Sequence, residues 1–247
     1  MFKSLILALA TVGSVAAAPT SSGNLANSVS VPQHKHKRDL TSRGWSGAIQ
    51  EADSGTWNFV QGTVVLPTLN DQNNPKGSGD IWVGIDGNNC GTAILQTGIV
   101  CYGDGSFWVW TEWWQYNMQD YDTNLGVSGG DTVRMTVNAT STTSGTTLIE
   151  NLTTGKSVSQ TFTGETRYPL CESDAEWIVE DFQENGKPVP LVNWGTIEFT
   201  NTVASGPGTS VTAAGSELIN IKLDDGTIVT QSSVDNDGNV FVKYIGN

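Results

Sequence analysis

The sequence predicts an all-β domain in which two antiparallel sheets pack as a sandwich. Short runs rich in Val, Ile, Thr, Trp and Phe recur along the chain, separated by Gly, Asn, Asp and Ser. No segment keeps the apolar spacing of a helix over three turns, and the 28 glycines also disfavour helices. No repeat period is visible, which favours a sandwich over a barrel or a propeller.

The N-terminal segment is typical of a secretory signal followed by a short pro-segment. Residues 1–18 are mostly apolar and end in small residues, as signal peptides do. Residues 19–38 lack aromatics and end in HKHKR, whose Lys37-Arg38 pair resembles a dibasic processing site. No second apolar run is long enough to cross a membrane. We therefore expect a secreted, extracellular protein with no membrane anchor and a mature domain at 39–247.

Charge and histidine content narrow the function of that mature domain. Residues 1–38 hold four of the 12 basic residues, both histidines and no acid. Residues 39–247 thus combine eight basic residues with all 25 acids, a net charge of −17, and contain no histidine. This excludes Ser-His and Cys-His nucleophiles and histidine-ligated zinc, and we expect no cofactor. Without a basic patch, we also expect no nucleic-acid partner.

Several runs of the mature chain are expected to form strands. They are, in chain order, residues 56–66, 80–86, 106–116, 131–140, 146–152 and 175–182. The stretch SVDNDGNVFVKY is expected to form a hairpin, because Asp237-Gly238 suits a tight turn. Its DNDGN segment resembles the start of a calcium loop, but the required glycine does not follow Asn239 and no flanking helices are visible, so we interpret it as a turn and expect no metal.

Cysteines and sequons fit a secreted chain. Three cysteines imply one disulfide and one spare thiol, and the sequence alone permits three pairings. The sequons at Asn138 and Asn151 are candidate glycosylation sites.

Alternation along the strands places carboxylates among aromatic residues. One face of residues 106–116 carries Trp108, Trp110, Glu112, Trp114 and Tyr116. This face is either an aromatic inner surface of the sandwich or the wall of a cleft. Glu112 favours the cleft, because an unpaired carboxylate in a core would cost several kcal/mol.

The run AEWIVEDF, residues 175–182, carries acids on both faces of its strand. Glu176 and Glu180 share one face with Ile178, whereas Asp181 lies on the other. Such acids are either strand-end and network residues or parts of a functional site, and their position alone does not decide between these roles.

Three blocks of the sequence resemble the glutamic peptidases, or eqolisins. They are WVGIDGNNCGTAILQTG (82–98), WTEWW (110–114) and LCESDAEWIVEDF (170–182), and TLIENLTTGKSVSQTF (147–162) is a further match. The likeness runs from about Trp45 to Tyr244, with the blocks in the same order and spacing. It implies a secreted acid endopeptidase that cleaves proteins or peptides, is insensitive to pepstatin, and has a jelly-roll or concanavalin-like two-sheet sandwich.

The resemblance also implies the site residues. It places the catalytic pair at Gln96 and Glu180. It suggests further cleft residues that bind peptide or hold the pair, namely Trp82, Asp86, Trp110 and Glu112. Glu180 would be the general base that activates water, since a Glu side chain ionises near pH 4 when unperturbed. The amide of Gln96 would stabilise the oxyanion.

The family pattern further implies a disulfide between Cys90 and Cys171, which leaves Cys101 unpaired. The chain departs from the pattern at Trp108, where Asp is common, and at Trp114, where Tyr is expected. These two departures affect the expected substrate preference and not the catalytic pair.

Two alternatives compete with this interpretation. The triplet DSG at 53–55 copies the motif of pepsin-like aspartic peptidases, but it follows polar residues and has no second copy, so a hairpin turn is expected there. A carbohydrate-binding or glycoside-hydrolysing β-sandwich is the alternative from another class, with Glu112 and Glu180 as acid and base.

We expect a monomer. Two further expectations follow from charge. The basic end of the pro-segment is expected to hold that segment against the acidic cleft until acid neutralises the carboxylates. We also expect the mature chain to be more stable near pH 3 than near pH 8, because protonation relieves the repulsion among its acids.

Overall fold

The computed structural model describes residues 39–121, 124–184 and 187–246. The expected signal and pro-segment, residues 1–38, lie outside this part of the chain. The described residues form strands, turns and connections without any helix, which confirms the predicted all-β class. Accordingly, within these ranges no helix has the length and apolar character needed to cross a membrane.

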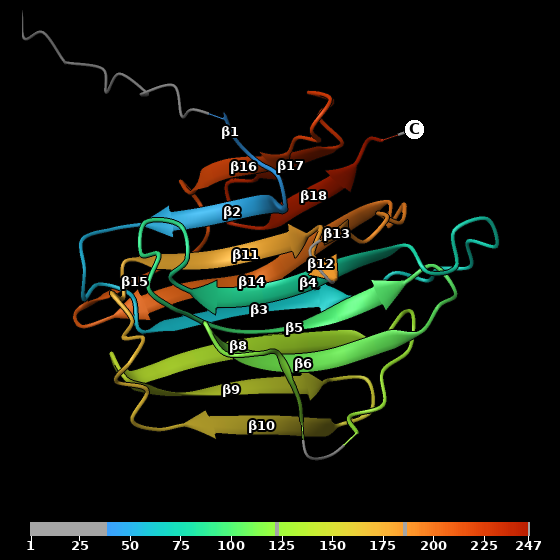
Figure 1. Cartoon of the computed structure of the whole chain (residues 1–247). Coiled ribbons are helices and arrows are strands. Elements are labelled where there is room, and N and C mark those ends of the chain that lie inside the picture. Colours follow the sequence, from blue (N-terminus) through green and yellow to red (C-terminus); the bar gives the residue numbers. More distant parts are fainter. Residues whose placement is uncertain (1–38, 122–123, 185–186, 247) are drawn as a thin grey trace, which may run out of the picture. The chain divides into compact units, whose positions relative to one another are not determined.

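Two large sheets make up the sandwich (Figure 1). The first sheet has the order β1 (Asp39–Ser42), β16 (Glu217–Ile221), β2 (Trp45–Glu51), β11 (Asp174–Glu180), β4 (Ser78–Ile85), β5 (Ile94–Tyr102), β6 (Phe107–Trp114) and β7 (Gln119–Asp120). The second has the order β10 (Lys156–Phe162), β9 (Ser144–Asn151), β8 (Thr132–Ser141), β3 (Phe59–Val65), β14 (Thr196–Gly206), β18 (Val240–Tyr244) and β17 (Thr230–Val234), with β15 (Thr209–Val211) beside β14. A separate hairpin joins β12 (Gln183–Glu184) to β13 (Lys187–Pro188).

Each expected run contains or overlaps a strand, and the predicted hairpin near the C-terminus is the β17–β18 pair. Gly238 has a φ of 85° in its turn, a conformation that favours glycine. Two details differ from expectation. The turn at 53–55 connects β2 of the first sheet to β3 of the second, so it is a crossover and not a hairpin. Strand β6 ends at Trp114, so Tyr116 lies beyond the aromatic strand face.

The main core lies between the two sheets. Ile81, Val83 and Ile85 of β4 share it with Val60 and Val64 of β3, as alternation predicts. A hydrogen bond also crosses between the sheets, because the indole N–H of Trp177 on β11 donates to the backbone carbonyl of residue 61 on β3, at 2.7 Å.

The outer face of the first sheet carries a second, smaller apolar cluster. Its buried members are Ile49, Trp82, Val100, Trp110, Ile178 and Ile219. Gly98 of β5 pairs with Trp82 on one side and Trp110 on the other. A Cβ atom on Gly98 would lie 2.6 Å from Cβ of Trp82 and 2.7 Å from Cζ2 of Trp110, so glycine leaves the two indoles room to pack. This face can therefore shield polar side chains from water.

Candidate active site

A cleft of about 380 Å³ opens on the outer face of the first sheet. Strands β2, β11, β4, β5 and β6, with the segments that follow them, supply its walls. The residues that line it are Trp45, Asp80, Gly87, Ile94, Gln96, Trp110, Glu112, Trp114, Met118, Glu180 and Phe182. Both members of the expected pair, Gln96 and Glu180, therefore face one cavity. Trp110, Glu112 and Trp114 form part of its wall, as the cleft interpretation of this strand predicts.

The pairing register brings together residues that are far apart in the sequence. Glu180 on β11 pairs with Asp80 on β4, and Gln96 on β5 pairs with Glu112 on β6. Directly paired residues on antiparallel strands point to the same face, with their Cβ atoms about 4.5–5.5 Å apart. Since β11, β4, β5 and β6 are consecutive in the sheet, both pairs lie on one continuous surface.

Two tryptophans lie against the Glu180 carboxyl. Trp82 Nε1 donates a 2.9 Å hydrogen bond to Oε2, and Trp45, the residue paired with Glu180 on β2, brings a second indole close enough to lower the pKa of this carboxyl. The two rings pack edge to face, with centroids 5.1 Å apart. Burial raises the pKa of Glu180 to about 7, although both indole donors act to lower it. The pKa of Glu180 in this cleft is therefore higher than the unperturbed value near 4 on which the sequence analysis relied.

The amide of Gln96 is held by Glu112. Its Nε2 donates a 2.6 Å hydrogen bond to Glu112 Oε2, and both residues are buried. Burial raises the pKa of Glu112 to about 7; the Gln96 bond lowers it and the neighbouring Glu180 raises it. Within the described protein, Gln96 Oε1 accepts no hydrogen bond. The amide thus has a fixed direction, with one N–H committed to Glu112 and a second N–H in reserve.

Asp86, another expected cleft residue, is not among the described residues that line the cleft. It is fully buried and accepts hydrogen bonds from the backbone N–H groups of Cys171, Glu172, Ser173 and Asp174, at 2.7 to 3.3 Å. These residues lead into β11. Asp86 therefore anchors the start of the strand that carries Glu180, and its carboxyl is committed to backbone.

The disulfide that the resemblance implies is present and joins Cys90 to Cys171, with Cα atoms 5.9 Å apart. The 81-residue separation means that this link contributes roughly 4 kcal/mol in the chain-entropy description. Cys101 is a buried free thiol whose Sγ donates to the carbonyl of Gly79 at 3.2 Å. Burial raises the pKa of this thiol to about 12, so it remains unreactive.

The two sequons differ in accessibility. Asn138 is exposed on β8 and remains a predicted glycosylation site. Asn151 is fully buried, and its Nδ2 donates to Asp131 Oδ2 at 2.8 Å and to the carbonyl of Gly126 at 3.2 Å. A glycan would have to be attached to that same nitrogen. The glycosylation expected at Asn151 is therefore incompatible with the folded domain.

The sequence analysis did not identify Asp80, which lines the cleft opposite Glu180. Asp80 is 1% exposed, and its Oδ1 accepts a 2.8 Å hydrogen bond from Trp110 Nε1. Burial, followed by the nearby Glu180, raises the pKa of Asp80 well above its usual range, and the Trp110 bond opposes this rise. Alternation contained the signal, because Asp80 is in phase with Trp82 at the start of the run 80–86.

Glu176 is a second buried acid on the cleft face of β11. Its side chain is fully buried, and neither carboxyl oxygen makes a hydrogen bond of good geometry within the described protein. Burial, followed by the charges of Asp174, Asp86 and Glu180, raises its pKa well above the usual range, and the nearby backbone N–H of Asn88 opposes this rise. A neutral, protonated side chain is the form that this environment favours.

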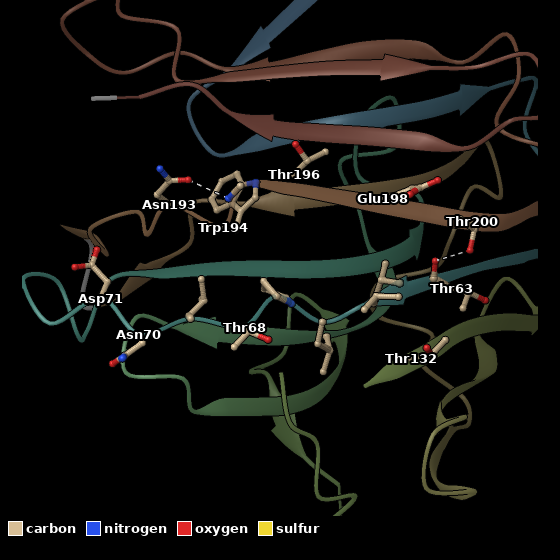
Figure 2. A pocket seen from close by; sticks show the side chains of 16 residues that line it. Thr63, Thr68, Asn70, Asp71, Thr132, Asn193, Trp194, Thr196, Glu198 and Thr200 are labelled. Atoms are coloured by element: carbon tan, nitrogen blue, oxygen red, sulfur yellow. Dashed lines mark hydrogen bonds between the residues drawn. The ribbon is translucent and has the colours of Figure 1, made fainter. Parts of the chain in front are cut away.

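A larger cavity of about 830 Å³ lies on the second sheet (Figure 2). It extends from the point where the pairing of β3 and β14 ends, at Thr63 and Thr200. Many of its lining side chains carry hydroxyl or amide groups, among them Thr68, Asn70 and Asn193 (Figure 2). Neither Gln96 nor Glu180 lines it. Convergent acids with shifted pKa values identify the smaller cleft as the candidate active site.

Comparison with known proteins identifies the family. The sequence model of the Peptidase A4 family matches residues 43–244, which span most of the chain. The chain therefore belongs to this family, the glutamic peptidases or eqolisins, and the resemblance seen in the sequence is confirmed. This membership supports peptidase activity over the carbohydrate-active alternative.

Individual relatives agree with this assignment. Aspergillopepsin-2 of Aspergillus niger is 37% identical over 225 residues, covering 83% of this chain and 78% of the relative. Scytalidopepsin B of Scytalidium lignicola is 36% identical over 196 residues, covering 76% and 74%. The solved structure of scytalido-glutamic peptidase with a transition state analog inhibitor aligns with a TM-score of 0.75 and 35% identity, covering 83% of this chain and 99% of that one. Aspergilloglutamic peptidase from Aspergillus niger aligns with a TM-score of 0.65 and 41% identity, covering 69% and 100%.

Proposed function

We propose that this chain is a secreted acid endopeptidase in which Glu180 and Gln96 form the catalytic pair. The observation that carries the proposal is that both side chains line one cleft, each with a fixed partner, Trp82 for Glu180 and Glu112 for Gln96. Family membership supports proteins or peptides as substrates. The absence of histidine from residues 39–247 leaves a carboxyl as the natural group for proton transfer.

Glu180 begins the reaction protonated at acid pH, since its pKa is about 7. Its carboxyl proton passes to the oxygen of the scissile carbonyl while its other oxygen takes a proton from the attacking water. A neutral gem-diol forms, and Glu180 is again protonated. Glu180 next gives its proton to the amide nitrogen and takes one from a gem-diol hydroxyl. The C–N bond then breaks to yield a carboxylic acid and an amine.

Gln96 assists at the carbonyl oxygen. As negative charge develops there, the amide N–H that Glu112 leaves free donates a hydrogen bond to it. One such donor contributes on the order of 3 kcal/mol of transition-state stabilisation. Because Glu112 already fixes the amide, little reorganisation is needed during the reaction.

We also propose how the protein is secreted, processed and assembled. Residues 1–18 direct secretion, residues 19–38 act as an inhibitory pro-segment, and the mature domain at 39–247 works as an extracellular monomer. The disulfide and the family relatives support an extracellular site of action. Pepstatin should not inhibit it, because the cleft offers no pair of Asp-Ser/Thr-Gly triplets.

The decisive experiment is cleavage of an unfolded protein at pH 3 to 4 with pepstatin present. Wild type should cleave it, whereas Glu180→Gln and Gln96→Ala should lose at least about 100-fold in kcat. Glu198→Gln, at an exposed acid on the second sheet, is the matched control and should match wild type. Full activity in Glu180→Gln or in Gln96→Ala would refute the pair, and cleavage of a polysaccharide instead would favour the carbohydrate-active alternative.

A further inference from the structure

The cleft contains a carboxyl that the proposed reaction does not use. Asp80 lines the cleft, is 1% exposed, and pairs with Glu180 across strands β4 and β11. An acid at such a position is costly to bury, so its presence calls for a compensating interaction. The compensating interaction that the structure provides is with an indole.

The two paired acids are held in parallel ways. Trp82 Nε1 donates to Oε2 of Glu180 at 2.9 Å, and Trp110 Nε1 donates to Oδ1 of Asp80 at 2.8 Å. The two indoles flank Gly98, and that of Trp110 forms part of the cleft wall. Asp80 is thus the hydrogen-bond acceptor that fixes the orientation of a substrate-facing ring.

The charges of neighbouring groups determine whether Asp80 accepts the Trp110 hydrogen bond as a carboxylate or as a neutral carboxylic acid. The titratable groups that act on it come from three neighbouring strands: Glu180 on β11, Glu112 on β6 and the Cys101 thiol on β5. None of the ion pairs among the described residues includes Asp80. Two carboxyl groups on directly paired residues of a buried cleft cannot both ionise without a large free-energy penalty. Since Asp80 is the more buried of the two, it keeps its proton when Glu180 loses one.

Building on the proposed function, we propose that Asp80 is a further positioning residue of this cleft. It acts as a neutral carboxylic acid that holds the Trp110 indole in place and adds no negative charge directly opposite Glu180.

Melting temperatures of Asp80→Asn test the protonation state without relying on peptidase activity. The pKa of Asp80 is higher in the folded protein than in the unfolded chain. Above about pH 4 the unfolded chain ionises this carboxyl while the folded protein keeps it protonated, so the wild type loses stability as pH rises. Asparagine mimics the neutral acid. We expect equal melting temperatures at pH 3 and a gain of at least about 4 °C for Asp80→Asn at pH 7. Glu198→Gln, with the same charge change on an exposed residue, should shift by less than about 1 °C at either pH.

Steady-state kinetics on a peptide at pH 3 to 4 test the positioning role. Asp80→Asn keeps an acceptor for Trp110 and should retain KM and kcat within about threefold. Asp80→Leu removes that acceptor and should raise KM roughly tenfold with a smaller fall in kcat, because the buried indole N–H is left unpaired. Because Asp80 is neutral when Glu180 ionises, the alkaline limb of kcat/KM should stay at the same pH in Asp80→Asn.

Three results would overturn the proposal: a melting difference that does not change between pH 3 and pH 7, an Asp80→Asn variant as impaired as Asp80→Leu in acid, or a wild-type KM in Asp80→Leu. Failure of the proposed function looks different. A wild type that cleaves no peptide, or an active Glu180→Gln, would refute the catalytic pair, while the melting comparison would still establish the state of Asp80.

Discussion

The amide nitrogen of Gln96 lies 2.6 Å from Oε2 of Glu112, the residue directly opposite it on β6. Two neighbouring strands of one sheet therefore set the direction of this amide. Loop movement is not needed to aim it. In the proposed reaction, Glu112 acts on the substrate only by holding Gln96. Variants of Glu112 that keep a hydrogen-bond acceptor for Gln96 should therefore behave differently from variants that remove it.

Glu112→Gln should retain kcat/KM within about threefold at pH 3 to 4, whereas Glu112→Leu should lose on the order of 100-fold in kcat. The pKa of Glu112 is about 7, so the side chain is neutral in acid and a Gln side chain reproduces its carbonyl acceptor. Steady-state kinetics on one peptide would measure both variants. Wild-type kcat in Glu112→Leu would show that Gln96 needs no partner.

The alkaline limb of kcat/KM should report the pKa of Glu180. If the protonated carboxyl is the reactive form, kcat/KM is flat in acid and falls as pH rises through about 7. Trp82→Phe removes a donor that stabilises the ionised carboxylate, so it should move this limb to higher pH. A pH profile of each enzyme, with folding checked by circular dichroism, decides the matter. A limb that moves to lower pH in Trp82→Phe would contradict the assignment.

Glu176→Gln should stabilise the domain at pH 7 and leave it unchanged at pH 3. The pKa of Glu176 is raised in the fold, so the folded state binds its proton more tightly than the unfolded chain does. Stability is therefore complete in acid and decreases as pH rises from about 4 towards the folded-state pKa. Thermal melts at both pH values would measure the difference. Together with Asp80, this residue gives the expected acid stability of the chain a local cause beyond net charge.

Asp86→Ala should destabilise the domain by at least about 3 kcal/mol without changing KM in the protein that remains folded. The variant leaves four backbone N–H groups at the start of β11 without their acceptor, two of them buried. Chemical denaturation and kinetics well below the melting temperature would separate the two effects. A raised KM at unchanged stability would instead place Asp86 on the substrate, as the sequence analysis allowed.

The sandwich and its strands could be predicted from the sequence because each strand carries its own alternation of apolar and polar residues. The proposed catalytic pair was predicted from family resemblance, and alternation placed Trp110 and Glu112 on one face. The order β2-β11-β4 could not be predicted, since it inserts a late strand between two early ones. Without that order, the proximity of Asp80 and Glu180 is invisible.

The sequence also could not predict how deeply individual polar side chains are buried. The raised pKa of Glu180 arises from desolvation in the assembled cleft, a tertiary effect that the reference value for glutamate does not contain. Asn151 illustrates the same limit. Its sequon is a local pattern, whereas its contacts with Asp131 and Gly126 depend on how β9 meets a distant loop.

The insertion of β11 between β2 and β4 has a consequence during protein synthesis. A nascent chain that ends before Asp174 already contains Gln96 and Glu112, yet the central strand of the first sheet is missing and so is Glu180. Translation must reach the last third of the coding sequence before a complete cleft can assemble. Under the proposed function, an incomplete chain that lacks Glu180 is therefore unable to cleave peptides.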